Sequence, residues 1–449
     1  MTEDSDGRPT TPAAGAAPDL APGPGDLPTE ATAAPSAGVR LGASFAKVWT
    51  ASTLSNLADG VLKIAVPLVA VQYTQSPILI AGIGFAMSLP WLVFALPFGA
   101  VVDRVDRRRA MLLANSARLV VAGLVAAAVW GGLGNIWLLY AAALVCGVAE
   151  VLYDTSAQSI LPQVVDRSAL TKANSRLYLG ELTANQFVGP PVGGFLVAAG
   201  AALALGAPAA LWAFAVAALA WVPGSFRVER AATRTTLSAD IKEGLTYLVH
   251  HRVLRTLAAM TGLSNFTSSA AFAVFVLYAV GPSSPMGLTE AGYGALSTTS
   301  AIGSVVGSLF AAQAVAALGR AWSLGIGVVT FTLMIGVPAI TPNAWAIGAT
   351  WVLAGAGVAI WNVIAVSLRQ QITPDRMLGR LNSCYRLLAW GTMPLGAAAG
   401  GVLAELFGLR ATFAVCAVIS ALTALGLFVA TDRAMDEAEA AAREPEPAT

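Results

Sequence analysis

With 56% hydrophobic and 11% charged residues among its 449, the chain differs from a soluble globular protein, in which about a quarter of the residues are charged. The formal net charge of +1 gives no electrostatic reason to expect a nucleic-acid partner. The composition therefore predicts an integral membrane protein in contact with the lipid bilayer.

Apolar stretches long enough to cross a bilayer recur along the chain, since a spanning helix needs about 20 mostly apolar residues. They predict an all-α membrane protein with twelve transmembrane helices in two pseudo-symmetric six-helix bundles. The expected spans are 44–73, 77–102, 109–131, 135–161, 169–199 and 203–224, then 253–280, 288–318, 321–341, 343–370, 377–407 and 409–431.

The polar segments divide the chain into five parts. Residues 1–43, rich in Ala, Pro, Thr and Gly, are expected to form a disordered cytoplasmic tail. The two bundles cover 44–224 and 253–431, and the cytoplasmic loop 225–252 between them is expected to contain a surface helix. A second cytoplasmic tail, 432–449, follows, in which we expect a short helix.

Basic residues are concentrated on one side of these spans. The connections after spans one, three, five, seven and nine contain no Lys or Arg, and Arg410 after span eleven is the exception on that side. Connections rich in Lys and Arg are held in the cytoplasm, so both termini are predicted to be cytoplasmic. The basic residues after spans two, four, eight and ten are Arg104, Arg107, Arg108, Arg109, Arg167, Lys172, Arg320 and Arg376.

The two halves of the chain share a weak internal repeat. At an offset of 208, the region after span four matches the region after span ten, in the pairs Ser159 and Ser367, Leu170 and Leu378, Asn174 and Asn382, Ser175 and Ser383, and Gly193 and Gly401. Chance recurrence in a Gly-rich chain is the alternative. A true duplication of six-helix halves is typical of transporters, which carry substrate along the interface between the halves.

The connection after span two runs from Gly99 to Arg109 and contains Asp-Arg followed by a basic run. It resembles motif A of the major facilitator superfamily, which the chain resembles over nearly all of 44–431. With Leu161-Pro162 and Ala173-Asn174-Ser175, it is most similar to the branch of bacterial siderophore and macrolide exporters. The resemblance implies a transporter of the bacterial plasma membrane, and we expect a monomer without a cofactor. The matching motif A positions are Gly99, Asp103, Arg104, Arg107 and Arg108.

Motif A is expected to form a cytoplasmic gate. The resemblance places Asp103 opposite the N-terminal end of span eleven, near Leu378 and Gly379, where unpaired amides and the helix dipole favour an anion. The corresponding loop after span eight ends in Gly319-Arg320 and has lost the acid. The first half is therefore expected to carry the function of the motif.

Span five contains Gly189-Pro190-Pro191-Val192-Gly193-Gly194. This segment resembles motif C of proton-driven antiporters, although Asn185 stands where a further Gly is usual. The resemblance implies export by proton antiport, through Gly189, Pro190, Gly193 and Gly194. An ordinary packing kink is the alternative, because Pro removes a backbone donor and Gly allows close helix contact.

Ionisable side chains inside spans are costly, so each requires a partner, a cavity or a function. Asp59 in span one, Glu150 in span four and Glu181 in span five lie deep enough to be proton-coupling candidates. In the superfamily, spans one and four line the central cavity, so Asp59 and Glu150 are placed where a proton or a cationic substrate group can be received.

The same charges have a structural alternative, in which they form static ion pairs. Lys63 lies four residues after Asp59 and so on the same helix face. Arg118 of span three is a further partner for Glu150 or Asp154, and Asp154 is expected to pair with Arg104 at the cytoplasmic end.

The second half has scarcely a central carboxylate. Its polar and aromatic span residues Asn265, Trp361, Asn362 and Trp390 can form a stacking and hydrogen-bonding wall for an amphipathic molecule. Helix packing is the alternative role for such aromatic residues.

No enzyme constellation is apparent. His250 and His251 are adjacent, which is poor spacing for two metal ligands on one helix face, so no metal site is expected. Cys146, Cys384 and Cys416 lie far apart in apolar stretches and do not predict a disulfide. A phosphate-binding Gly-rich loop is absent, so ATP is not expected to be the direct energy source.

The expected function is export of a small hydrophobic or amphipathic compound, such as a drug, an antibiotic or a siderophore-like metabolite, in exchange for protons. A proton-coupled importer and a non-transporting receptor or scaffold are the alternatives. The substrate itself is not identified by the residues.

Overall fold

The computed structural model describes residues 41–102, 104–226 and 237–443. Within these residues the chain is helical and contains no strand. Nearly all of the predicted N-terminal tail, together with Asp103 of motif A, lies outside the described residues.

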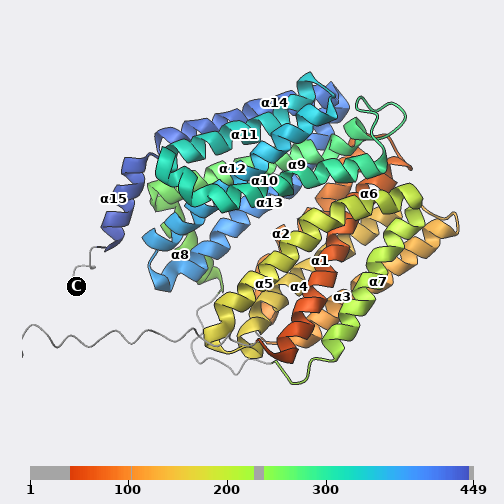
Figure 1. Cartoon of the computed structure of the whole chain (residues 1–449), viewed down its shortest axis with the longest axis horizontal. Helices are drawn as coiled ribbons and strands as arrows, with labels where there is room; N and C mark the ends of the chain where they lie inside the picture. Colours follow the sequence, from red (N-terminus) through yellow and green to blue (C-terminus); the bar gives the residue numbers. More distant parts are fainter. Residues whose placement is uncertain (1–40, 103, 227–236, 444–449) are drawn as a thin grey trace, which may run out of the picture. The chain divides into compact units, whose positions relative to one another are not determined.

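Most of the predicted spans appear as single long helices (Figure 1). Eleven helical segments of the described chain are long and apolar enough to cross a membrane. They are α1 (Gly42–Val71), α2 (Pro77–Val102), α3 (Arg107–Trp130), α4 (Ile136–Val164), α7 (Ala201–Ala220), α9 (Arg252–Ala279), α10 (Glu290–Leu318), α11 (Arg320–Ile340), α12 (Ala344–Ile372), α13 (Asp375–Phe407) and α14 (Leu409–Ala421), which continues as the 3₁₀ segment η3 (Leu422–Phe428).

Predicted span five is the exception, because it is built from several pieces. After the short 3₁₀ turn η1 (Arg167–Ala169) come α5 (Leu170–Leu182), a π-helical segment η2 (Thr183–Val188) and α6 (Gly189–Ala199). Pro190 and Pro191 lack backbone donors, so the helix cannot continue with regular hydrogen bonds here, and a wider turn accommodates the break. Counted as one segment, α5, η2 and α6 make the twelfth span.

The helices pack in two groups, one in each half of the chain. In the first half α1 contacts α7, α6, η2 and α5, and α3 lies beside α7 (Figure 1). In the second half α10 and α11 pack on α12, α13 packs on α9, and α11 lies beside α14 (Figure 1). The two sets of spans contact each other mainly through α13 with α2 and through α6 with α10, and also through α9 with α2.

Helix caps extend the internal repeat beyond the matches seen in the sequence. The Asn135 side chain accepts hydrogen bonds from the amides of Trp137 and Leu138 at the start of α4. At the same offset of 208, Asn343 accepts from the amides of Trp345 and Ala346 at the start of α12. Because an N-cap fixes where a helix begins, equivalent spans start at equivalent positions in the two halves.

Two predicted peripheral helices are present. In the central loop, α8 (Leu237–His250) packs against α13, where the Tyr247 hydroxyl donates to the Ile372 carbonyl. In the C-terminal tail, α15 (Asp432–Arg443) follows η3, and its Met435 is fully buried against the second half. Both helices have one apolar face, which explains why polar segments dock on the bundle.

Asp432 at the start of α15 supplies the acid that the loop after span eight lacks. Its carboxylate accepts hydrogen bonds from the Arg320 amide at 2.9 Å and the Ala321 amide at 3.0 Å, where α11 begins. The Arg320 guanidinium also forms ion pairs with Asp436 and Glu439 of α15. An acid at a helix N-terminus is favoured by the dipole, so the second half retains this stabilisation through a residue from after span twelve.

In the motif A connection the equivalent cap is Asp106. Its carboxylate accepts hydrogen bonds from the amides of Arg109 and Phe226 and from the Ser225 hydroxyl. Burial acts to raise the pKa of Asp106, but these hydrogen bonds outweigh it and lower the pKa below the ordinary value of 3.8. The connection after span two is thereby tied to the connection after span six.

Acidification should remove this stabilisation. Because the pKa of Asp106 is lower in the folded protein, its carboxylate stabilises the fold above pH 3.8, and this contribution is lost as the pH falls through the folded pKa. We expect Asp106→Ala to lower the free energy of unfolding by about 1–2 kcal/mol near neutral pH. Thermal unfolding in detergent should show the difference from the parent shrinking below pH 3.8. A loss of stability in Asp106→Ala that is equal near neutral pH and below pH 3.8 would contradict the role of the Asp106 charge.

Candidate functional site

Asp59 is the centre of a buried polar network between α1 and α3. Its Oδ2 lies 3.4 Å from Nη1 of Arg118, whose side chain is fully buried. The same guanidinium donates to Ser55 Oγ at 3.1 Å and to Asn115 Oδ1 at 3.5 Å. The charge of Asp59 is therefore compensated by a neighbouring helix and not by Lys63, although Lys63 lies one turn away on α1.

Aromatic rings enclose the other side of Arg118. Its guanidinium carbon lies 5.6 Å from the ring centre of Tyr153 on α4 and 5.5 Å from that of Trp212 on α7. Contacts of this kind stabilise a cation that has lost its water. Arg118 of α3 consequently connects its own helix with α1, α4 and α7 through one buried charge.

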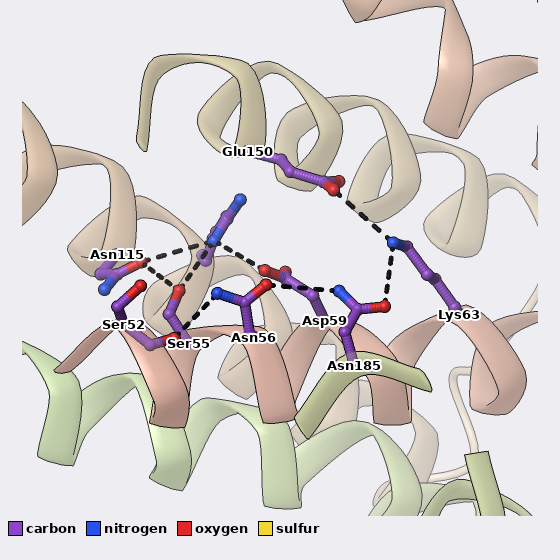
Figure 2. Close-up of polar contacts among 9 residues, drawn as sticks. Ser52, Ser55, Asn56, Asp59, Lys63, Asn115, Glu150 and Asn185 are labelled. Carbon is purple, nitrogen blue, oxygen red and sulfur yellow. Dashed lines mark hydrogen bonds and ion pairs between the residues drawn. The ribbon is translucent and has the colours of Figure 1, made fainter. Parts of the chain in front are cut away.

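Lys63 forms its ion pair with Glu150 and not with Asp59. Its Nζ lies 3.8 Å from Glu150 Oε1 on α4 and donates to Asn185 Oδ1 at 3.2 Å. Asn185 Nδ2 in turn lies 3.5 Å from Asn56 Oδ1, so the chain of contacts returns to α1 (Figure 2). Lys63 is 46% exposed and Glu150 17%, whereas the pair formed by Asp59 and Arg118 is almost entirely buried.

Two further acids, Asp154 and Glu181, lie in the spans of the first half. Asp154 lies one turn beyond Glu150 on α4 and is half-buried, while Glu181 on α5 is exposed. Neither forms an ion pair within the part of the chain that the structure describes. The expected pair between Asp154 and Arg104 is thus not observed, since Arg104 is exposed at the end of α2.

The glycines of the motif C segment bring backbones into contact on both sides of span five. A Cβ atom on Gly189 would lie 2.6 Å from the Gly60 Cα, and one on Gly193 would lie 2.8 Å from the Val61 carbonyl oxygen of α1. A Cβ on Gly194 would lie 2.3 Å from the Glu290 carbonyl oxygen of α10. The segment therefore holds span five against the turn of α1 that follows Asp59, and against a helix of the other half.

The basic residues of motif A anchor helix ends. Arg107 donates to the Ser159 carbonyl near the end of α4, and Arg108 donates to the Leu219 carbonyl at the end of α7. Cations near helix C-termini are favoured by the dipole and by unpaired carbonyls. A Cβ on Gly99 would meet nothing within 4 Å, so packing in this conformation does not require a glycine there. The predicted contact of Asp103 with the start of α13 lies outside the described residues.

The four cavity residues predicted in the second half do lie together. They line a cavity of about 340 Å³ formed by α9, α11, α12 and α13. Asn265 Nδ2 donates to the Ala389 carbonyl, which joins α9 to α13. The polar and aromatic lining is completed by Thr261, Ser264, Phe331, Trp361, Asn362, Arg369, Tyr385, Arg386 and Trp390.

Sequence reasoning missed several members of these networks. In the sequence Asn185 stands out only as a departure from motif C, and its hydrogen bond with Lys63 is evident only in the structure. The sequence analysis assigns no role to Asn115 or Arg369, although each is a polar residue inside or at the end of an apolar span. The cost of burying such groups was the available signal. Among the described residues no group of three His, Cys, Asp or Glu side chains can hold a metal ion.

A polytopic helical bundle with paired charges inside the spans of its first half, and with a cavity among the helices of its second half, is typical of a membrane transporter. The chain matches the family model of the transmembrane secretion effectors, MFS_3, over residues 34–449, and it belongs to this family of the major facilitator superfamily. The family assignment confirms the resemblance drawn from motif A.

Relatives of this chain include proteins named as a multidrug efflux pump and as an MFS-type transporter. The multidrug efflux pump Tap of Mycolicibacterium fortuitum is 27% identical over 385 residues, covering 81% of this chain and 90% of Tap. The uncharacterised MFS-type transporter y4rN of Sinorhizobium fredii is 28% identical over 395 residues, covering 84% of this chain and 92% of y4rN.

Solved structures share the fold at low sequence identity. A bacterial homologue of the iron transporter ferroportin, in an inward-facing state, has a TM-score of 0.67 and 17% identity, covering 86% of this chain and 98% of its own. The nucleoside transporter NupG has a TM-score of 0.66 and 12% identity, with the same coverage.

Proposed function

We propose that this protein exports a small amphipathic compound from the bacterial cytoplasm in exchange for protons, by alternating access between its two six-helix halves. The observation that carries the proposal is the pairing of Asp59 with Arg118 and of Glu150 with Lys63 next to the motif C segment. The multidrug efflux activity in the name of the relative Tap favours the same direction of transport.

Coupling requires acids whose pairing changes with conformation. Asp59 is followed by Gly60, and a Cβ on Gly60 would lie 2.6 Å from the Asn185 carbonyl oxygen of span five. A movement of span five against α1 therefore displaces Asn185, which binds Lys63, the partner of Glu150. Conformation and the proton affinity of the acids are linked in this way, because an ion pair favours the charged form of a carboxylate.

The contact between α6 and α10 supports the assignment of the described conformation as open to the cytoplasm. Gly194 and Pro190 of α6 approach Glu290 and Gly294 of α10 backbone to backbone, at the ends of these helices predicted to be extracellular. Close contact there excludes substrate from that side. Rocking of the halves would break this contact and open the other face.

Proton release in inside-out membrane vesicles tests the coupling assignment. With the lumen acidified and a pH-sensitive dye present, a transported compound added outside should dissipate the gradient. We expect Asp59→Asn and Glu150→Gln to abolish this response, because neutral side chains cannot exchange a proton, while protection of the purified protein from heat by the same compound persists.

Glu405→Gln provides the matched control, since Glu405 is an exposed acid at the far end of α13 that accepts a hydrogen bond from Ser76. It should leave the response intact. If Asp59→Asn and Glu150→Gln both dissipate the gradient as fast as the parent, the two acids are structural. Accumulation of the compound by intact cells, in place of its loss, would instead identify an importer.

A further inference from the structure

The cavity of the second half is lined by cations and by no acid. Arg369 of α12 and Arg386 of α13 both contribute to its wall, whereas none of its lining residues is Asp or Glu. Asp59 and Glu150 of the first half already have cationic partners, since Asp59 pairs with Arg118 and Glu150 with Lys63. The charges in the cavity therefore favour a negatively charged ligand over a positively charged one.

Arg369 has an incomplete set of partners. Its guanidinium stacks on Tyr385 at 4.3 Å from the ring centre, and its Nε is buried without a hydrogen-bond acceptor. It forms no ion pair with any of the described residues. A guanidinium stacked on a ring still presents its N–H edges, which are suited to bind a carboxylate through two parallel hydrogen bonds.

Arg386 is held in a similar way. Its guanidinium lies 4.6 Å from the ring centre of Trp390 and 5.8 Å from that of Trp91 on α2, and the two indoles contact each other edge to face at 4.8 Å. Asp154 and Glu181 of the first half attract it through space but form no ion pair with it. Arg386 is exposed, so its N–H groups remain accessible to a ligand.

We infer that the ligand of this cavity is an amphipathic anion, with an aromatic or aliphatic body and one carboxylate group. The carboxylate binds Arg369 and Arg386, and the body packs against Trp361, Trp390 and Phe331. Asn265 and Asn362 supply further hydrogen bonds along the same wall. This inference rests on the proposed transport function, for which it names the class of substrate.

Charge-matched compounds test the inference on the purified full-length protein. Naphthalene-2-acetate, 2-(2-naphthyl)ethanol and 2-(2-naphthyl)ethylamine share one aromatic body and differ in charge, and indole and biphenyl analogues provide two more such triplets. In each triplet we expect the carboxylate to raise the unfolding temperature most. Equal or greater protection by the neutral or cationic compounds, or none by any carboxylate, would overturn the inference.

Two variants locate the binding site. Arg369→Gln and Arg386→Gln should each weaken carboxylate binding by about tenfold or more, as expected for loss of a charge-assisted hydrogen bond. They should leave binding of the neutral compound unchanged, which a general folding defect would not. Arg433→Gln removes the same charge from the exposed face of α15 and is the matched control. Unaltered carboxylate binding in both cavity variants would place the anion elsewhere.

The binding and transport hypotheses fail separately. Binding is measured in detergent without a proton gradient, so a carboxylate that binds through both arginines but elicits no proton release in vesicles would support the ligand class and contradict proton antiport. Proton release driven by cationic compounds alone would support proton antiport and contradict the inferred class of ligand.

Discussion

Replacement of Arg118 by methionine should lower the free energy of unfolding by about 3–5 kcal/mol, because it leaves Asp59 as an uncompensated charge in a buried site. Ser55 and Asn115 would lose the same donor, and Tyr153 and Trp212 would lose their cation. Thermal or denaturant unfolding in detergent measures the effect. Arg109→Met, at an exposed position on the same helix, should change stability by much less.

The double variant Arg118→Met, Asp59→Leu separates the charge from the packing. If the unpaired carboxylate causes the loss, removing it should restore more than half of the stability, since a buried ion pair can often be replaced by apolar residues at little cost. A double variant no more stable than Arg118→Met would assign the loss to the aromatic contacts instead. Because the double variant also lacks Asp59, it should not exchange protons.

Replacement of Gly194 by valine should separate the two halves at the predicted extracellular side. The new Cβ would lie 2.3 Å from the Glu290 carbonyl oxygen, and the atoms in its way belong to the backbone of α10, so no side chain can move aside. Overpacking of this kind costs about 1–3 kcal/mol. The population should therefore shift away from the described conformation by about tenfold.

Cysteine accessibility measures this shift. A single cysteine introduced at Ser297, half-buried on α10 beyond the contact, should react faster with a membrane-impermeant maleimide added outside when Gly194 is valine. Gly123→Val is the matched control, since a Cβ on Gly123 meets nothing within 4 Å. Labelling that is unchanged in Gly194→Val would show that the contact between α6 and α10 does not govern access.

The chain's own pattern was sufficient to predict the spans, because long apolar stretches have few alternatives to membrane helices. The internal repeat was also readable, and the caps at Asn135 and Asn343 show that it extends to the start of equivalent helices. Span five is the exception: the interrupted segment η2 ends where Gly189 contacts Gly60 of α1 and where Pro190 lacks a backbone donor.

The partners of the buried charged residues could not be predicted from the sequence. The cost of burying charge correctly indicated that Asp59, Lys63, Arg118 and Glu150 need partners. The spacing of Asp59 and Lys63 indicated a pair within one helix, yet each of these residues pairs with a residue of another element. The repeat was no guide here, because the positions 208 residues after Asp59 and Glu150 are Thr267 and Val358.

The sequence by itself determined the membrane class, the approximate spans, the motif segments and the residues that cannot be buried without a partner. The tertiary structure alone decided which charges meet, which arginines line the cavity and that Asp432 replaces the acid missing after span eight. The physical reason is that these helices are apolar on most sides, so hydrophobic periodicity does not define their rotation. Close packing of small residues between helices sets that rotation, and with it the partners of every buried polar group.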